Sequence, residues 1–290
     1  MAGSGRLYSK RIIVDVVIFC ALAFGLTWLL LSLYILDAAA ASRYLGPMKV
    51  GAPAFFVAVY APTLAAIAVT AWRYGRAGLA NLFRSFVRFR VKWYWIAISL
   101  LGYPLLWLVV EIVSSATSRE LVSFSFDPWL VALPAVILGG HLLSDPGALG
   151  EELGWRGFML PRLLELMDAR AAALLVGLVW TAWHLPAFYV ETLSQSRVGL
   201  GIFTLYVLAF SVLMTWIFVN TRGSVLWAGV VPHMLFNAVG PAGITPVLWV
   251  TMLGTIVLLV LGGKHLRGLG NPKAKLPQAE FLANSERGRT

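Results

Sequence analysis

Cysteine and charge are both scarce in this 290-residue sequence. Its one cysteine, Cys20, excludes an intrachain disulfide and a cysteine-rich metal site. Asp, Glu, Lys and Arg together make up only 12% of the residues, whereas 59% are apolar. This balance excludes a disordered protein. It also argues against a water-soluble enzyme, because the polar groups could not cover so much apolar surface. The sequence therefore predicts a protein whose solvent is lipid.

Long apolar runs divide the chain into about eight candidate transmembrane helices. The runs are continuous and do not show the two-residue alternation of barrel strands. We therefore expect an all-α, polytopic membrane protein, with one transmembrane domain at 1–263 and a basic, flexible tail at 264–290. The expected spans are 12–36, 51–72, 93–115, 129–166, 171–190, 200–219, 224–240 and 243–262.

Positive charge exceeds negative charge, with 23 Lys and Arg against 13 Asp and Glu. In a membrane protein this excess is better explained by cytoplasmic loops than by nucleic acid. With the N-terminus inside, 19 of the 23 basic residues fall on the inner side. We expect an integral protein of the plasma (inner) membrane, with both termini cytoplasmic, the lipid bilayer as a partner and no nucleic acid. The stretch 73–92 is either a basic amphipathic segment on the inner leaflet or a loop that only sets the topology.

Ionisable groups inside apolar spans are costly, so they are candidates for function. The first group is Glu151, Glu152 and Arg156. Glu152 and Arg156 are four residues apart and can form an ion pair on one helix face. Glu151 points about 100° away, which leaves it available as a general base. The alternative is a surface ion-pair cluster at a helix end. Asp145-Pro146 just before them is a helix start that would break the long fourth span.

Two further motifs lie in later apolar spans. Trp180 and His184 are four residues apart and share a helix face, as do His233 and Asn237. Each motif alone is better explained by helix packing. Together with a glutamate they supply a carboxylate base, imidazoles and oxyanion donors, which are the groups that hydrolysis needs. Asp15, near the end of the first span, is expected to be interfacial or paired.

The three motifs resemble those of the CPBP family of intramembrane proteases, which includes CAAX prenyl endopeptidases and bacterial Abi-type proteins. The shared pattern is Glu-Glu-x-x-x-Arg, an aromatic-x-x-x-His and His-x-x-x-Asn, in this order within 151–237. Trp180 stands where Phe is commoner in the family. The resemblance implies an eight-helix fold with a polar intramembrane cavity open to the cytoplasm. It also implies hydrolysis of a peptide bond in a membrane-associated peptide or protein, either prenylated or leader-bearing.

The resemblance also assigns roles to individual residues. Glu151 would activate water with help from His184, while His233 and Asn237 would stabilise the oxyanion. Glu152, Arg156 and Trp180 would support this set. Family members are described both as metalloproteases and as glutamate proteases. We expect no bound metal or other cofactor; the alternative is a zinc ion held by Glu151, His184 and His233.

Two alternatives to a protease remain open from the sequence. One is a non-catalytic membrane protein of the same fold, acting in bacteriocin immunity or scaffolding. The other is a transporter, although no internal repeat supports it. A geometric condition also applies, because His184 is expected about 20 Å along its span, whereas Glu151 is expected at an inner helix end. The two side chains meet only if the helix after Asp145-Pro146 begins deep in the membrane.

Overall fold

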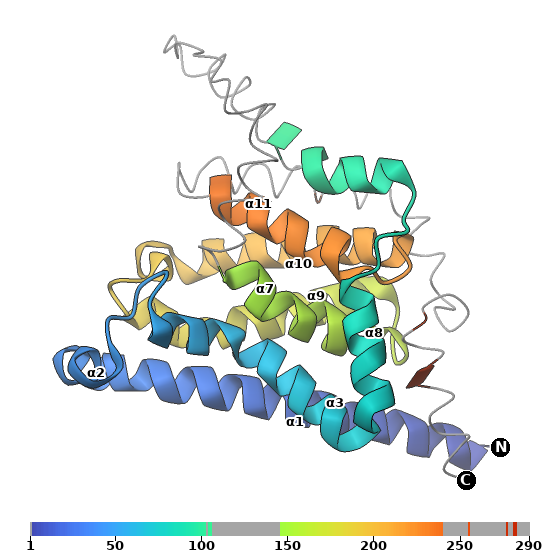
Figure 1. Cartoon of the computed structure of the whole chain (residues 1–290), viewed down its shortest axis with the longest axis horizontal. Helices are drawn as coiled ribbons and strands as arrows, with labels where there is room; N and C mark the ends of the chain where they lie inside the picture. The colour runs from blue at the N-terminus through green and yellow to red at the C-terminus, as the bar shows by residue number, and fades with distance from the viewer. Residues whose placement is uncertain are drawn as a thin grey trace.

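The computed structural model describes residues 2–102, 104–105, 146–239, 255, 277 and 281–282. Every regular element within these residues is a helix, and the chain is an all-α polytopic membrane protein (Figure 1). Two short elements, η2 (Leu153–Met159) and η5 (Leu226–Val230), are π-helices, whereas η3 (Leu185–Tyr189) and η4 (Ser194–Arg197) are 3₁₀-helices. In chain order the main elements are α1 (Ala2–Leu36), α2 (Ala38–Leu45), α3 (Pro53–Phe86), α7 (Gly147–Glu152), η2 (Leu153–Met159), α8 (Leu160–Leu164), α9 (Ala169–Trp183), η3 (Leu185–Tyr189), η4 (Ser194–Arg197), α10 (Leu200–Asn220), η5 (Leu226–Val230) and α11 (Val231–Val239).

Four helices of the described part are long and apolar enough to cross a membrane, which confirms four of the expected spans. A fifth expected span begins with the shorter apolar helix Trp93–Gly102. The expected span 224–240 is divided between η5 and α11. The part of 129–166 before residue 146 lies outside the described residues, as does almost all of the rest of 93–115, of the span 243–262 and of the tail 264–290. The four spanning helices are Leu7–Leu36, Pro53–Phe86, Ala169–Tyr189 and Leu200–Asn220.

The spanning helices run roughly parallel to one another, apart from the final part of α3 (Figure 1). Three of them are joined by polar contacts within the apolar core. Thr27 of α1 donates a hydrogen bond of 2.8 Å to the carbonyl of Ala58 in α3. It also accepts one of 2.9 Å from the indole of Trp183 in α9. Because hydrogen bonds between helices have few competing partners in lipid, Thr27 fixes how α1, α3 and α9 meet.

The segment α7–η2–α8 is almost completely buried among the spans. Its close approach to α3 depends on Gly154, where a Cβ atom would lie only 2.6 Å from the Cβ of Pro62. Thr63 of α3 also donates to the carbonyl of Leu149 at 3.3 Å. α7 begins at Gly147, one residue after the predicted first helical residue, Pro146. Asp145, the predicted cap, lies outside the described residues.

A buried charged cluster ties α1 to α3 and α8. Asp15 of α1 is fully buried. Its carboxylate accepts a hydrogen bond of 2.9 Å from Nε of Arg73, lies 3.6 Å from Nε of Arg162, and also accepts from the hydroxyl of Tyr74. The expectation that Asp15 is paired is therefore confirmed. We call these four residues the Asp15 cluster.

Candidate active site

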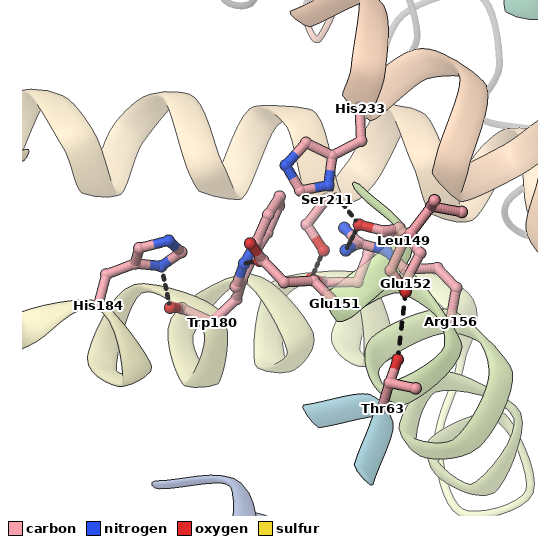
Figure 2. Close-up of polar contacts among 10 residues, drawn as sticks. Thr63, Leu149, Glu151, Glu152, Arg156, Trp180, His184, Ser211 and His233 are labelled. Atoms are coloured by element: carbon pink, nitrogen blue, oxygen red, sulfur yellow. Dashed lines mark hydrogen bonds and ion pairs between the residues drawn. The ribbon is translucent and has the colours of Figure 1, made fainter. Parts of the chain in front are cut away.

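The residues of the three motifs lie on helices that meet in the core of the protein (Figure 2). Glu151 and Glu152 end α7, and Arg156 follows in η2. α9 carries Trp180 and is followed by His184 as its C-cap, whereas α11 carries His233 and Asn237. The π-helix η2 directly follows the two glutamates, and the π-helix η5 directly precedes α11. Wide π turns of this kind are frequent at functional sites, where they change the direction in which side chains project.

Glu152 is the centre of a fully buried ionic network. Its Oε1 accepts a hydrogen bond of 2.9 Å from Nη1 of Arg156, and neither side chain is exposed. This confirms the predicted pair. The same oxygen lies 2.8 Å from Nδ1 of His233. Nothing in the sequence indicates this second contact, because Glu152 and His233 are 81 residues apart. The pair predicted to be self-contained therefore also holds an imidazole.

Glu151 is buried, with 5% of its surface exposed, and its carboxylate faces α9. Its Oε2 accepts a 2.5 Å hydrogen bond from the indole Nε1 of Trp180. The sequence does not indicate this partner, and the availability of Glu151 as a general base stays a prediction. The contact brings Glu151 to α9, which the geometric condition set by the sequence requires. Trp180 is one turn before His184, so α7 does place Glu151 beside that part of α9.

The indole of Trp180 brings the other candidate side chains together. Its ring centre lies 5.2 Å from that of His233 and 6.0 Å from that of His184. The guanidinium of Arg156 lies over the same ring, 4.5 Å from its centre, in a favourable cation–π position. Glu151, His184 and His233 thus all contact one side chain, as Figure 2 shows.

The hydrogen bonds of the two imidazoles define which ring nitrogen carries a proton. Nδ1 of His184 lies 2.9 Å from the carbonyl oxygen of Trp180. Because a carbonyl only accepts, Nδ1 must donate, and Nε2 of the neutral ring is then an acceptor. Nδ1 of His233 faces the carboxylate of Glu152, which accepts from Arg156 at the same oxygen. Nδ1 of His233 is therefore also a donor.

Asn237 lies one turn after His233 on α11 and is half-buried. Its side chain forms no hydrogen bond with any residue that the structure describes, so the structure does not join it to the network. Oε2 of Glu152 and both Nε and Nη2 of Arg156 are buried and likewise have no hydrogen-bond partner among those residues. The site thus keeps hydrogen-bonding capacity beyond its contacts with the described residues.

A metal site would require several ligands close together. Within the described parts of the chain, no three His, Cys, Asp or Glu side chains form a group that could hold a metal ion. The zinc alternative, with Glu151, His184 and His233 as ligands, gains no support from this arrangement. Independence of a metal stays a prediction.

Comparison with known proteins finds similarity to CAAX prenyl endopeptidases over the segment that carries the three motifs. Residues 125–239, which include all three motifs, match the family model described as "Type II CAAX prenyl endopeptidase Rce1-like". A stretch of 94 residues is 32% identical to CAAX prenyl protease 2 of Methanococcus maripaludis. The alignment covers 30% of this chain and 34% of that protein, so about a third of the relative's length is matched. The resemblance predicted from the motifs is confirmed over this segment.

Proposed function

We propose that this protein is an intramembrane endopeptidase in which Glu151 activates a water molecule to attack a peptide bond. The observation that carries the proposal is the meeting of Glu151, His184 and His233 around Trp180, from three separate helices. A buried carboxylate beside two imidazoles has the acid–base groups that amide hydrolysis requires. The similarity of residues 125–239 to Rce1-like endopeptidases supports the same chemistry.

The two imidazoles suit different steps of this reaction. Neutral His184 presents Nε2 as an acceptor, so it can share the proton that Glu151 removes from water. His233 donates through Nε2 only when its ring is protonated, and the carboxylate of Glu152 is the counter-ion for that form. We therefore assign His184 to water activation and His233, with Asn237, to stabilisation of the oxyanion.

The supporting residues position the reacting groups. Arg156 neutralises Glu152, and Glu152 orients the ring of His233 through Nδ1. The indole N–H of Trp180 holds Oε2 of Glu151. A reacting carboxylate or imidazole that is held in place by such contacts loses less entropy when the transition state forms. No step requires a metal ion in this scheme.

The substrate we propose is a peptide or protein held at the membrane. The relative from M. maripaludis is named a CAAX prenyl protease, and we extend to this chain a substrate anchored by a prenyl group or by a leader segment. We also propose that both termini face the cytoplasm of a plasma (inner) membrane. Arg43 belongs to α2, which lies at the end of α1 opposite the N-terminus (Figure 1), as the predicted orientation requires.

Glu151→Gln tests the proposal directly. An amide oxygen can still accept from Trp180, but the side chain can no longer take a proton. Wild type, Glu151→Gln and the exposed control Glu191→Gln would be reconstituted in liposomes. Cleavage of a prenylated peptide that carries a fluorophore and a quencher would then be measured. We expect Glu151→Gln to lower kcat/KM by about 10²–10⁴-fold and to leave the temperature of thermal unfolding unchanged. The control Glu191→Gln should cleave the peptide at the wild-type rate.

Wild-type cleavage by Glu151→Gln would exclude the glutamate mechanism. If the wild-type protein cleaves neither prenylated nor leader-bearing peptides, the non-catalytic alternative of immunity or scaffolding is favoured. Solute uptake that is lost in His184→Ala would favour a transporter instead.

A further inference from the structure

Acidic residues are absent from a long stretch near the start of the chain. Between Asp37 and Glu111 the sequence has eight Lys and Arg and no Asp or Glu. Six of these cations fall within 73–92, and only Arg73 forms an ion pair with a described residue. We call the other five, together with Arg222, the basic collar: Arg76, Arg84, Arg88, Arg90, Lys92 and Arg222.

The backbone turns sharply at the start of the collar. Gly75 interrupts α3 with φ of 59° and ψ of −154°, a conformation that only glycine adopts without strain. The final part of α3, residues 76–86, then runs across the direction of α1, α9 and α10, at the end of the bundle where α1 begins (Figure 1). A helix that lies across the spanning helices runs along the plane of the membrane.

This final part of α3 has one face against the protein and one face outward. Gly78, Leu82 and Ser85 are buried. The outward residues 76, 80, 83, 84 and 87 follow the spacing of one helix face. That face combines arginines with large apolar side chains, which is typical of a helix lying in a membrane interface and not of one facing water. The exposed large apolar residues here are Phe83, Val87, Phe89 and Trp93, with 46%, 52%, 59% and 77% of their surface exposed.

The loop after α3 brings two cations together. Nη1 of Arg88 donates to the carbonyl of Arg222 at 2.9 Å, and Oγ of Ser224 donates to the carbonyl of Arg88 at 2.9 Å. Burial and the nearby charge of Arg222 lower the pKa of Arg88. Neither arginine forms an ion pair with a described acidic residue. The fold therefore maintains a repulsion that a phosphate group between the two guanidiniums would relieve.

We propose that the basic collar binds the headgroups of anionic phospholipids in one leaflet, with Phe83, Phe89 and Trp93 inserted beside the first acyl-chain segments. Charge complementarity favours this occupant, because the collar combines many cations with no acidic neighbour in the sequence. The exposed aromatic side chains favour a lipid over an acidic soluble protein, because interfacial aromatics anchor proteins at the level of the headgroups. The inference is independent of the proposed protease activity.

The test compares two triple variants of the full-length chain. Arg84→Gln/Arg90→Gln/Lys92→Gln removes three cations of the collar. The control, Arg43→Gln/Lys49→Gln/Arg197→Gln, removes three exposed cations outside the collar. Both proteins and wild type would be titrated in detergent with phosphatidylglycerol or phosphatidylcholine, and the bound lipids counted by native mass spectrometry. We expect wild type and control to prefer phosphatidylglycerol, and the collar variant to lose affinity for it by about fivefold per cation at low salt.

Further measurements keep the proposal falsifiable if the collar variant folds poorly. The variant Arg84→Lys/Arg90→Lys should keep the preference for phosphatidylglycerol, because it keeps both charges. In wild type, 1 M salt should weaken this preference. Inorganic phosphate at equal ionic strength should not displace the lipid. Equal losses in both triple variants, no lipid preference in wild type, or displacement by free phosphate would each overturn the proposal.

Discussion

Two buried charged clusters of this protein differ in the acid–base groups that they contain. The Asp15 cluster combines one carboxylate with two guanidiniums and a phenol. The candidate site combines the carboxylates of Glu151 and Glu152 with Arg156 and two imidazoles. Both clusters take charge out of water, so burial alone does not distinguish them. The candidate site has two imidazoles, each with one nitrogen that can donate and one that can accept a hydrogen bond, whereas the Asp15 cluster has only partners for one carboxylate.

The position of each cluster agrees with this difference. Asp15 joins α1 to α3 and α8, so its contacts determine how these helices are held together. Glu151, His184 and His233 instead meet around one aromatic ring and are held by neighbours that are not themselves required to react. We therefore expect stability to depend mainly on the first cluster and turnover mainly on the second.

The largest change in stability is expected from Asp15→Asn. Removal of the charge leaves Arg162, which is 5% exposed, without its counter-ion. Loss of one partner of a buried pair costs about 3–5 kcal/mol. Unfolding in detergent would measure this loss. The control is Asp168→Asn, because Asp168 caps α9 at an exposed position and Asn caps helices equally well.

Peptide cleavage by the fraction of Asp15→Asn that remains folded should match wild type. If its turnover number fell while its stability stayed normal, the Asp15 cluster would belong to the reaction, and the distinction between the two clusters would be lost.

A smaller effect, on turnover instead of stability, is expected from His233→Gln. The variant removes the proposed oxyanion donor but leaves Glu152 paired with Arg156. We expect kcat to fall by about 10²–10³-fold and stability to fall by about 1.5–3 kcal/mol, the value of a hydrogen bond to a charged group. Steady-state kinetics and unfolding of the same preparation measure both. A stability loss as large as that of Asp15→Asn, with normal kcat, would make His233 a structural residue.

Much of the architecture can be predicted from local sequence. Runs of apolar residues identify the four described spans, because a span needs only about 20 such residues in a row. The pair of Glu152 and Arg156 is predicted because residues four apart meet on any helix. The order of the three motifs also indicates the family that the chain resembles, and the match of residues 125–239 confirms this resemblance over that segment.

The partners of individual side chains could not be predicted in this way. The contact of Glu152 with His233 depends on how α7 meets α11, and that of Glu151 with Trp180 on how α7 meets α9. Such packing is decided by close approaches along whole helices, as at Gly154, and not by spacing within one motif. The π turn after Glu152 is equally invisible in the residue pattern.

The smallest of the expected effects tests the contact that the sequence missed. Trp180→Phe keeps an aromatic ring but removes the indole N–H that donates to Glu151. Hydrogen bonds to charged groups contribute about 1.5–3 kcal/mol, so we expect kcat to fall by about tenfold to a hundredfold with little change in KM. The variant therefore asks whether this chain depends on that donor.

A double-mutant cycle separates this contact from simple packing. Unfolding would be measured for Trp180→Phe, Glu151→Ala and the combined variant. If the indole N–H holds the carboxylate, the two changes are not additive, because either one removes the same hydrogen bond. Additive losses of stability together with an unchanged kcat in Trp180→Phe would show that the ring contributes only packing, and that Glu151 is positioned by its other neighbours.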